Sequence, residues 1–367
     1  MKIIVPLPNW RARRKMLNNN PKIASGSITD PGMPAGSIFF IVNANVRAGV
    51  PDISDFLTAQ RIYLEREGFQ VSLGVVDDRT SISGILRNLR RLKREIKMYH
   101  PQIVHAHYGT MTAAIAVFAI DHERLIITFR GDDLLGTPNP GLYWRIRERI
   151  GGWLSQWAAT YATTIITVSE NLRQALPVSL QQKVAVLPNG VDYEVFRTLD
   201  KTEARFQLGW DTTTKVITFN ASSGSNQKVK NIKLAQATID LLGQKLERVR
   251  LHALSNSRRE EVNLVLNASD CLIVTSLHEG SPNIVKEAMA CNLPIVTVPC
   301  GDVVERLKNV QPGAICPYDE NELAKEIFKI LKSGQRSNGR EQLIIQGLDA
   351  ANIAKRLGQI YQRALNA

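Results

Sequence analysis

The sequence predicts an α/β protein made of two doubly wound, Rossmann-like domains that face each other across a cleft. Short apolar runs suited to buried strands alternate with longer stretches of helical periodicity along most of the chain. The alternation pauses at a turn formed by Pro188, Asn189 and Gly190 and then begins again. The 367 residues are enough for two domains with separate cores.

The first domain is predicted over residues 37–188. It follows an N-terminal extension, residues 1–36, that is rich in Pro, Gly, Asn and Ser. Six apolar runs predict the strands of this domain, and helices between successive strands favour a parallel sheet covered on both faces. These runs lie at residues 37–43, 69–76, 103–105, 125–129, 165–168 and 184–187.

The second domain is predicted over residues 189–349 and repeats the pattern with four strands. Its apolar runs lie at residues 216–219, 249–253, 271–274 and 293–298. A last amphipathic helix, within residues 350–367, is expected to join the first domain. Because parallel sheets bind ligands beyond the carboxyl ends of their strands, we expect the site in the cleft between the domains.

The net charge of the chain limits the classes of partner that it can be expected to bind. The formal net charge is +12, with basic clusters at residues 11–15, 87–97 and 145–149. Such a charge suits nucleic acid, an anionic membrane or an anionic substrate. No interleaved basic and aromatic signature or zinc-finger spacing accompanies it, so we expect a phosphate-bearing substrate or a membrane surface and no nucleic-acid partner.

Signals of the cellular compartment point to the cytoplasm. No apolar run approaches the roughly 20 residues that span a bilayer. At the N-terminus a short apolar stretch is broken by prolines and followed by basic residues, an order unlike that of a secretory signal. The four cysteines form no CxxC pair and are expected to be buried free thiols.

Two predicted helices leave alternatives open. The helix over residues 81–98 has one apolar stripe, and its basic residues form either a solvated face or a patch for anionic lipid head groups. The helix over residues 141–162 carries Trp144, Trp153 and Trp157. Core packing is the default expectation for these tryptophans, and an interfacial role is the alternative.

The stretch at residues 276–290 concentrates polar residues of the second domain. A polar loop follows the strand at residues 271–274, and a helix then starts, with Ser281 suited to its N-cap and Pro282 to its first position. Glu279 therefore lies beside free backbone N–H groups that favour an anion. Glu287 falls in or beside the apolar arc of the helix, where a carboxylate is costly unless it is hydrogen-bonded.

Polar residues also follow other predicted strands. His105 and His107 occupy alternate positions at a strand end, and we expect them to point to opposite sides, with at most one facing the cleft. Asp132 and Asp133 either cap a turn or lie in the site. Lys230 is placed at a helix start, where a cation is unfavourable against the helix dipole, and this indicates an anionic ligand.

Absent motifs disfavour other classes of enzyme. The sequence has no GxGxxG and no GxxxxGKS/T, so a dinucleotide oxidoreductase and a P-loop NTPase are disfavoured. It also has no GxSxG nucleophile elbow.

An ordered set of motifs resembles one known family. Glu279 and Glu287 form an E-x7-E pair within HEGSPNIVKE, which AMACNLPIVTVPCGDV follows. Further matches are HAHYG at 105–109, TFRGDDL at 128–134, LPNGVDYEVF at 187–196 and VKN at 229–231. Over residues 38–365 the chain resembles retaining glycosyltransferases of the GT-B fold, glycosyltransferase family 4 (glycosyl transferases group 1).

The resemblance implies roles for the matching residues. Glu287 would hold the ribose hydroxyls of the donor nucleotide, and Glu279 would contact the transferred sugar. Lys230 would neutralise the diphosphate leaving group. Further donor contacts would come from Gly49, Asn189 and the backbone of Gly280, Ser281, Pro282 and Asn283.

The sequence departs from the family in a few places. The arginine that usually stands about five residues before Lys230 is missing, and Lys228 is the cation nearest to its place. The lysine ammonium is a point charge, whereas an arginine guanidinium donates through a planar fork. Arg130 stands where some members have a histidine, so Arg130 would contact phosphate and His107 would supply the nearest imidazole. The glycine-rich turn is reduced to one glycine, Gly49, and the stretch after Lys230 is short.

The implied activity is retaining transfer of a hexose from a UDP- or GDP-sugar to an acceptor hydroxyl, with Glu279, His107 and Arg130 as catalytic candidates. No Asp-x-Asp metal pair is present, and no metal or cofactor is expected. The acceptor would be a glycan or lipid-linked precursor of bacterial cell-surface polysaccharide or glycolipid, met at the inner face of the cell membrane.

Three alternatives remain open. A nucleotide-sugar 2-epimerase and a catalytically weak nucleotide-sugar-binding protein share the architecture. A nucleic-acid binder would explain the charge but not the paired glutamates.

Overall fold

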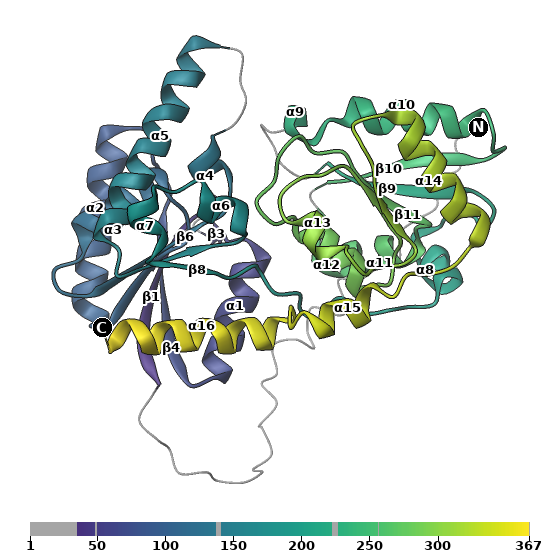
Figure 1. The fold of residues 1–367 in the computed structure, drawn as a ribbon. Coiled ribbons are helices and arrows are strands. Elements are labelled where there is room, and N and C mark those ends of the chain that lie inside the picture. The colour runs from purple at the N-terminus through teal and green to yellow at the C-terminus, as the bar shows by residue number, and fades with distance from the viewer. Residues whose placement is uncertain (1–34, 48–49, 137–140, 222–226, 256, 367) are drawn as a thin grey trace, which may run out of the picture. The chain divides into compact units, whose positions relative to one another are not determined.

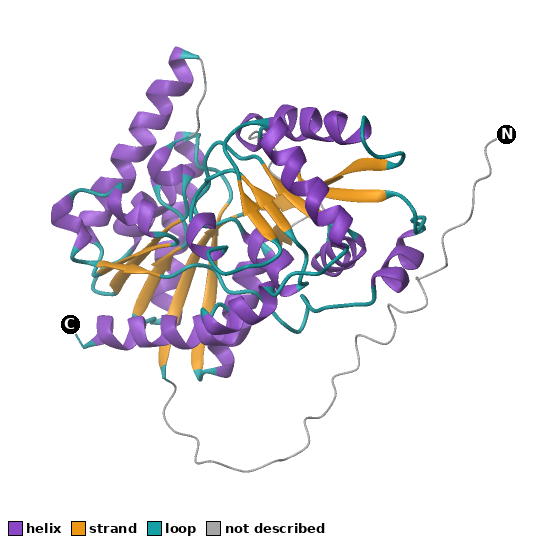
Figure 2. Ribbon diagram, turned by 45° about the vertical axis from the view of Figure 1, so that its right-hand side comes forward, coloured by secondary structure: helices purple, strands orange, loops and turns teal. Residues whose placement is uncertain are grey.

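The computed structural model describes residues 35–47, 50–136, 141–221, 227–255 and 257–366. Figure 1 and Figure 2 show two parallel sheets, each flanked by helices. The α/β class with two Rossmann-like domains is therefore confirmed.

The first sheet has six parallel strands in the order β4-β1-β5-β6-β7-β8. They are β1 (Gly36–Asn43), β4 (Phe69–Val76), β5 (Ile103–Ala106), β6 (Arg124–Phe129), β7 (Thr164–Thr167) and β8 (Val184–Val186). Each predicted strand of this domain is confirmed to within one residue at either end. A short antiparallel ribbon of β2 (Asn45–Arg47) and β3 (Val50–Asp52) follows β1 and was not predicted.

The first domain contains α1 to α7. These are α1 (Asp55–Arg66), α2 (Ile82–Tyr99), α3 (Thr110–Ala119), α4 (Asp132–Leu135), α5 (Leu142–Tyr161), α6 (Glu170–Gln174) and α7 (Val178–Gln181). Alternate residues of β1 supply two separate cores, as the period of a strand requires. Phe39 packs in the core that α2, α3 and α5 cover, whereas Phe40 packs on the opposite face with residues of α1 and α16.

The second sheet has five parallel strands in the order β10-β9-β11-β12-β13. They are β9 (Lys215–Asn220), β10 (Val249–Leu254), β11 (Cys271–Val274), β12 (Ile295–Thr297) and β13 (Gly313–Ile315). The four predicted strands are present. The fifth, β13, was missed because three residues, two of them glycine and alanine, give no apolar pattern.

The remaining helices, α8 to α16, follow the first domain in sequence. They are α8 (Lys201–Leu208), α9 (Gln227–Lys230), α10 (Ile232–Gly243), α11 (Arg259–Ala268), α12 (Asn283–Ala290), α13 (Val303–Arg306), α14 (Glu320–Ser333), α15 (Gly339–Ile345) and α16 (Ala350–Leu365). All four cysteines are buried and free, as expected. Within the residues described, we find no helix with the length and apolar character needed to cross a membrane.

The helix α16 returns the chain to the first sheet and packs against α1 (Figure 1). Tyr361 is fully buried, and its hydroxyl lies 2.7 Å from Nδ1 of His105. Nε2 of the same imidazole lies 2.7 Å from Oγ1 of Thr128 on β6. This buried chain of hydrogen bonds joins α16 to two neighbouring strands.

The chain crosses between the two sheets twice, and the crossings lie side by side. The N–H of Val191 donates to the carbonyl of Leu348, and the N–H of Ala350 donates to the carbonyl of Val191, both at 2.8 Å. A Cβ on Gly190 would lie 2.7 Å from Cα of Ala350, so only glycine allows this approach.

The predictions for two helices of the first domain meet different outcomes. Helix α2 starts as predicted, with Oγ of Ser81 accepting from the N–H of Gly84. In α5 the default expectation of core packing is wrong for Trp144 and Trp153, which are exposed, whereas Trp157 is partly buried against the core. Their spacing alone does not show that the first half of the helix carries its apolar side outward.

We predict that Tyr361→Phe lowers the free energy of unfolding by about 1–3 kcal/mol, because Nδ1 of His105 then loses its only buried partner among the described residues. Urea denaturation measures the change. The control is Arg363→Ala on the exposed side of the same helix, which should change stability by less than about 0.5 kcal/mol. Equal stability of Tyr361→Phe and wild type would contradict the proposed link between α16 and the sheet.

Candidate active site

A lysine–glutamate pair lies where β11 ends. Nζ of Lys230 is 2.5 Å from Oε1 of Glu279, and Oγ of Ser276 donates to the same oxygen at 2.9 Å. Oγ1 of Thr275 donates to the carbonyls of Lys230 and Asn231, which ties the end of α9 to the end of β11. The paired side chains are only 13% and 18% exposed, so a full positive and a full negative charge are held together at a largely enclosed surface.

The start of α12 differs from the prediction. The N-cap residue is Pro282, one position later than predicted, and Ser281 does not cap the helix. Oγ of Ser281 instead donates to Asp302 at 2.8 Å and accepts from Nζ of Lys286 at 3.0 Å. The nearby carboxylate of Asp302 is a stronger acceptor than the hydroxyl's alternative partners, so the hydroxyl turns away from the helix.

Lys286 is a buried residue that the sequence reasoning missed. Its side chain is 1% exposed, and burial lowers the pKa of its ammonium to about 8. Asp302, which also accepts from Nε of Arg306 at 3.0 Å, supplies the opposing negative charge. A lysine within an otherwise apolar helical arc was the available signal. This network ties Ser281, in the loop between Glu279 and α12, to Asp302 and Lys286.

Glu287 lies one turn into α12 and borders the cleft. Its pKa is raised to about 7, chiefly because the carboxylate is desolvated, while the charges of Arg259 and Lys286 oppose the shift. With a pKa of about 7, the Glu287 carboxyl group is protonated in about half of the molecules at neutral pH, and hydroxyl groups that hydrogen-bond to the carboxylate would offset its desolvation.

The opposite wall of the cleft belongs to the first domain. Nη2 of Arg130 lies 3.1 Å from Nδ1 of His107, and Nη1 donates to Oδ1 of Asn189 at 2.8 Å. Nδ2 of Asn189 donates in turn to Oδ1 of Asn283, the first residue of α12, at 3.1 Å. The guanidinium also stacks 4.2 Å from the ring centre of Phe56. A continuous polar chain thus connects the two domains.

The protonation of His107 follows from its partner. A guanidinium only donates, so Nδ1 accepts and the imidazole proton resides on Nε2. Burial lowers the pKa of His107 well below its usual value, and the nearby His105 and Arg130 add to the effect. His107 is therefore neutral. Burial likewise lowers the pKa of Arg130, to about 10, so that residue stays charged at neutral pH.

The prediction that His105 and His107 point to opposite sides is wrong. Their rings stack with centroids 3.9 Å apart, because residues two apart on a strand share a face. Only His107 contacts a residue of the cleft, since His105 bonds to Tyr361 and Thr128 in the core.

Asp133 organises the loop that carries Arg130. Its fully buried carboxylate accepts from the N–H groups of Gly109, Arg130 and Gly131 at 2.8, 2.9 and 2.9 Å. Of the two readings left open by the sequence, the turn-capping one is therefore correct for Asp133. Its neighbour Asp132 has Oδ1 3.4 Å from Nε2 of His278 in the other domain.

The loops of the two domains touch through their backbones. A Cβ on Gly280 would lie 2.0 Å from the carbonyl oxygen of Arg130, and one on Gly131 would lie 3.4 Å from the N–H nitrogen of Gly280. Gly131 has φ +145, a conformation that favours glycine. Two glycines therefore allow an approach that side chains would prevent.

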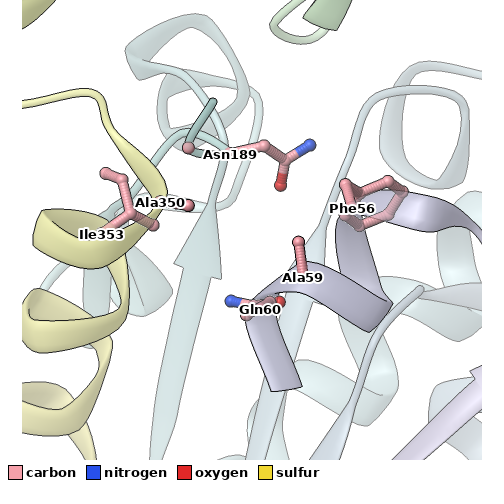
Figure 3. A pocket seen from close by; sticks show the side chains of 7 residues that line it. Phe56, Ala59, Gln60, Asn189, Ala350 and Ile353 are labelled. Atoms are coloured by element: carbon pink, nitrogen blue, oxygen red, sulfur yellow. The ribbon is translucent and has the colours of Figure 1, made fainter. Parts of the chain in front are cut away.

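Among the described residues, three cavities that share lining residues border the cleft. The largest, ≈ 370 Å³, is lined by Phe56, Arg130, Asn189, Asn220, Lys230, Leu254, Val262, Glu279, Gly280, Ser281, Pro282, Asn283, Ile284 and Glu287. A second, ≈ 210 Å³, shares Phe56, Val262, Asn283 and Glu287 with it. Figure 3 shows the smallest, ≈ 20 Å³, where Phe56 and Gln60 of α1 face Asn189 and the start of α16.

The structure brings most of the predicted site residues to the largest cavity. Nine line it, namely Arg130, Asn189, Lys230, Glu279, Gly280, Ser281, Pro282, Asn283 and Glu287. His107 does not line this cavity, but it contacts Arg130, which does. Gly49 and the side chain of Lys228 lie outside the described residues. Sequence reasoning missed the apolar wall formed by Phe56, Leu254 and Val262.

In the part of the chain that the structure describes, no group of three or more His, Cys, Asp or Glu residues is arranged to hold a metal ion.

Comparisons with known proteins agree with this arrangement. Residues 54–195 match the family model described as Glycosyltransferase Family 4, and residues 224–333 match that described as Glycosyl transferases group 1. An uncharacterized glycosyltransferase of Methanocaldococcus jannaschii is 22% identical over 262 residues, 65% of this chain and 69% of that protein.

Two solved structures share the fold. Sucrose-phosphate synthase from Thermosynechococcus elongatus is 16% identical with a TM-score of 0.72, and the match covers 89% of this chain and 98% of that one. The Anabaena protein HepE, in complex with UDP and glucose, is 16% identical with a TM-score of 0.66, over 89% of this chain and 100% of that one. At such identities the likeness establishes the fold alone.

We predict that Glu287 by itself lowers the stability of the folded state as pH rises from about 4.5 to about 7, so that Glu287→Gln gains stability relative to wild type over this range. In that range the folded state keeps a proton on Glu287 that the unfolded state releases, so raising the pH favours unfolding. Urea denaturation at about pH 5 and pH 8 measures both proteins. An identical pH dependence in the two would show that the carboxylate is not desolvated.

We also predict that Gly280→Ala destabilises the protein by about 1–3 kcal/mol, because the new methyl group must displace the carbonyl of Arg130. Thermal or urea denaturation measures the change. Gly243→Ala is the matched control, since the nearest atom to its Cβ is 3.9 Å away. Equal stability of the two variants would mean that the loops are not in contact.

Proposed function

We propose that this chain, a glycosyltransferase of the GT-B fold, transfers a hexose with retention of configuration from a nucleoside-diphosphate sugar to an acceptor hydroxyl. The observation that carries the proposal is the pairing of Lys230 with Glu279 at the cavity wall, with Glu287 on the same wall and Arg130 opposite. In the proposal, residues 189–349 hold the donor, and residues 37–188 with the last helix hold the acceptor.

We infer the position of the donor from the charged residues and the cavities of the cleft. Glu287 takes the ribose hydroxyls, and the second cavity beside it, bordered by Phe196 and Val262, takes the base. The diphosphate lies against Lys230 and the cavity-lining backbone before α12, where the first N–H groups of the helix have no helical partners. The solved HepE structures contain UDP, UDP-glucose or UDP and glucose, which supports a uridine nucleotide as the first donor to test.

Arg130 supplies a second cation to the diphosphate. It compensates for the arginine that family members carry before Lys230, and its fork is held by His107 and Asn189 so that little conformational entropy is lost on binding. His107 is neutral and donates only through Nε2, so we propose it as a positioning residue for Arg130 and not as a general base.

The chemical step needs no metal in this proposal. The bond between the anomeric carbon and the diphosphate oxygen breaks, and the electron pair leaves with the diphosphate, whose growing charge Lys230 and Arg130 stabilise. The acceptor oxygen forms its bond to the anomeric carbon on the same face, and its proton passes to the departing oxygen. Glu279 orients the sugar hydroxyls, and Lys230 is released from Glu279 to meet the phosphate.

The acceptor is proposed to be a glycan or lipid-linked precursor of cell-surface polysaccharide or glycolipid. The exposed basic face of α2, with Arg87, Arg90, Arg94 and Lys97, supports an encounter with an anionic membrane. We do not favour the 2-epimerase alternative, because both matching family models describe glycosyltransferases. Sugar-nucleotide binding without turnover is the alternative that the experiment below excludes.

The test is a thermal-shift screen of UDP-, GDP- and ADP-sugars, followed by donor hydrolysis with the nucleotides that stabilise the protein. We expect Lys230→Met and Glu279→Gln to reduce hydrolysis by about 10²–10³-fold, because the first loses charge stabilisation of the leaving group and the second loses the carboxylate that orients the sugar. Lys233→Met, an exposed lysine on the next helix, is the matched control and should keep full activity.

Two results would contradict the proposal. Stabilisation by a nucleotide sugar without any hydrolysis or transfer would indicate a binding protein. Undiminished hydrolysis in Glu279→Gln would show that the sugar lies elsewhere in the cleft.

A further inference from the structure

The first half of α5 exposes an unusual number of large apolar side chains. Figure 1 shows this half of α5 extending past α3 and α4. The exposed fractions are 72% for Leu142, 72% for Tyr143, 50% for Ile146, 54% for Ile150 and 63% for Trp153. Trp144, on the other side of the helix, is 41% exposed as well. Isolated exposed apolar residues are common, but these five within twelve consecutive residues form a patch.

These side chains fall on one stripe of the helix. At 100° per residue, the five occupy an arc roughly 100° wide. Arg145 and Arg149 border the stripe on one side and Arg147 borders it on the other. An apolar stripe flanked by arginines on both sides is the arrangement of a helix that lies at a membrane interface.

Residues 142–147, Trp144 included, are exposed on all sides, and from Glu148 onward the reverse side of the helix faces the protein. A Cβ on Gly152 would lie 3.6 Å from the carbonyl of Leu134, and one on Gly151 would lie 3.4 Å from Cγ2 of Thr110. Glu148 lies on the same side, 3.2 Å from where a Cβ of Gly136 would be. Over residues 148–153 the amphipathic pattern of α5 is therefore inverted, with small and polar residues inward and large apolar residues outward.

The second half of α5 is fixed to the candidate site. Oγ of Ser155 donates to the carbonyl of Asp133 at 2.5 Å and accepts from the N–H of Thr110 at 2.7 Å. Ala158 and Ala159 are fully buried in the core under α3. Asp133 also holds the loop of Arg130, so the exposed stripe is rigidly connected to the wall of the cleft.

The net charge of the chain favours an anionic bilayer over a second copy of the chain as the partner of this stripe. A second copy of the chain would bring another net charge of +12 to the same surface, which opposes association. An anionic bilayer complements the three arginines and the basic face of α2, which packs on α3 beside α5. Tryptophan, tyrosine and arginine are also the side chains that suit the boundary between head groups and acyl chains.

We propose that the stripe formed by Leu142, Tyr143, Ile146, Ile150 and Trp153 inserts into the interfacial layer of an anionic phospholipid bilayer, with the flanking arginines on the head-group phosphates. The insertion deepens the proposed function in one respect, because it brings the cleft to the surface from which a lipid-linked acceptor is drawn. It does not depend on the donor chemistry.

The experiment uses the full chain in vesicle flotation, with vesicles of phosphatidylcholine alone or mixed with phosphatidylglycerol. We expect binding to the mixed vesicles and at least about tenfold weaker binding to the neutral ones. The double variant Ile146→Glu/Trp153→Glu should bind the mixed vesicles at least about tenfold more weakly than wild type. Phe206→Glu, on α8 and 80% exposed, is the matched control and should bind as wild type does.

Three outcomes would overturn the insertion. The first is wild-type binding by the double variant, and the second is no binding of the wild type to mixed vesicles. The third is a dimer in light scattering that the double variant abolishes, because the stripe would then bind a second copy. Donor hydrolysis is measured on all variants and should be unchanged, since none of the altered residues lines the cleft. A failure of hydrolysis in the wild type would refute the proposed function and leave this inference standing.

Discussion

Three backbone N–H groups that converge on the buried carboxylate of Asp133 hold together the part of the first domain on which the site depends. One belongs to Gly109 at the start of α3, and two belong to the loop after β6. Burial of a carboxylate is costly and raises its pKa, and these three donors offset much of that cost. Through its own carbonyl the same residue also holds Ser155 of α5. Asp133 therefore holds the loop of Arg130, which contacts Gly280, and it also holds α5, which carries the exposed stripe.

The fold was predictable because parallel, doubly covered sheets leave a strong trace in sequence. A strand buried on both faces is a continuous apolar run, and ten such runs were found. What escaped was structure with little apolar content. Residues 313–315 form a strand because β12 offers an edge with free backbone groups, not because of their own composition. The ribbon of β2 and β3 is equally short.

Part of the candidate site was predictable for a different reason. Glu287 is a charged residue in the apolar arc of a helix, and such a conflict shows in a sequence. Glu279 follows a predicted strand and precedes a helix, a position that favours an anion, whereas Lys230 was expected at a helix start and instead ends α9. The polar connections between elements do not show in this way. Ser281 lost its expected capping role to Asp302, twenty-one residues away, and no local rule could foresee that partner. The outward side of α5 was equally hidden, because periodicity gives a stripe but not the direction in which it faces.

The paired crossings near Val191 and Ala350 have a mechanical consequence. Two separate linkers would let the domains twist, slide and open independently. Because here the two strands of chain are hydrogen-bonded to each other and packed without a side chain at Gly190, neither can shift along the other without breaking these bonds.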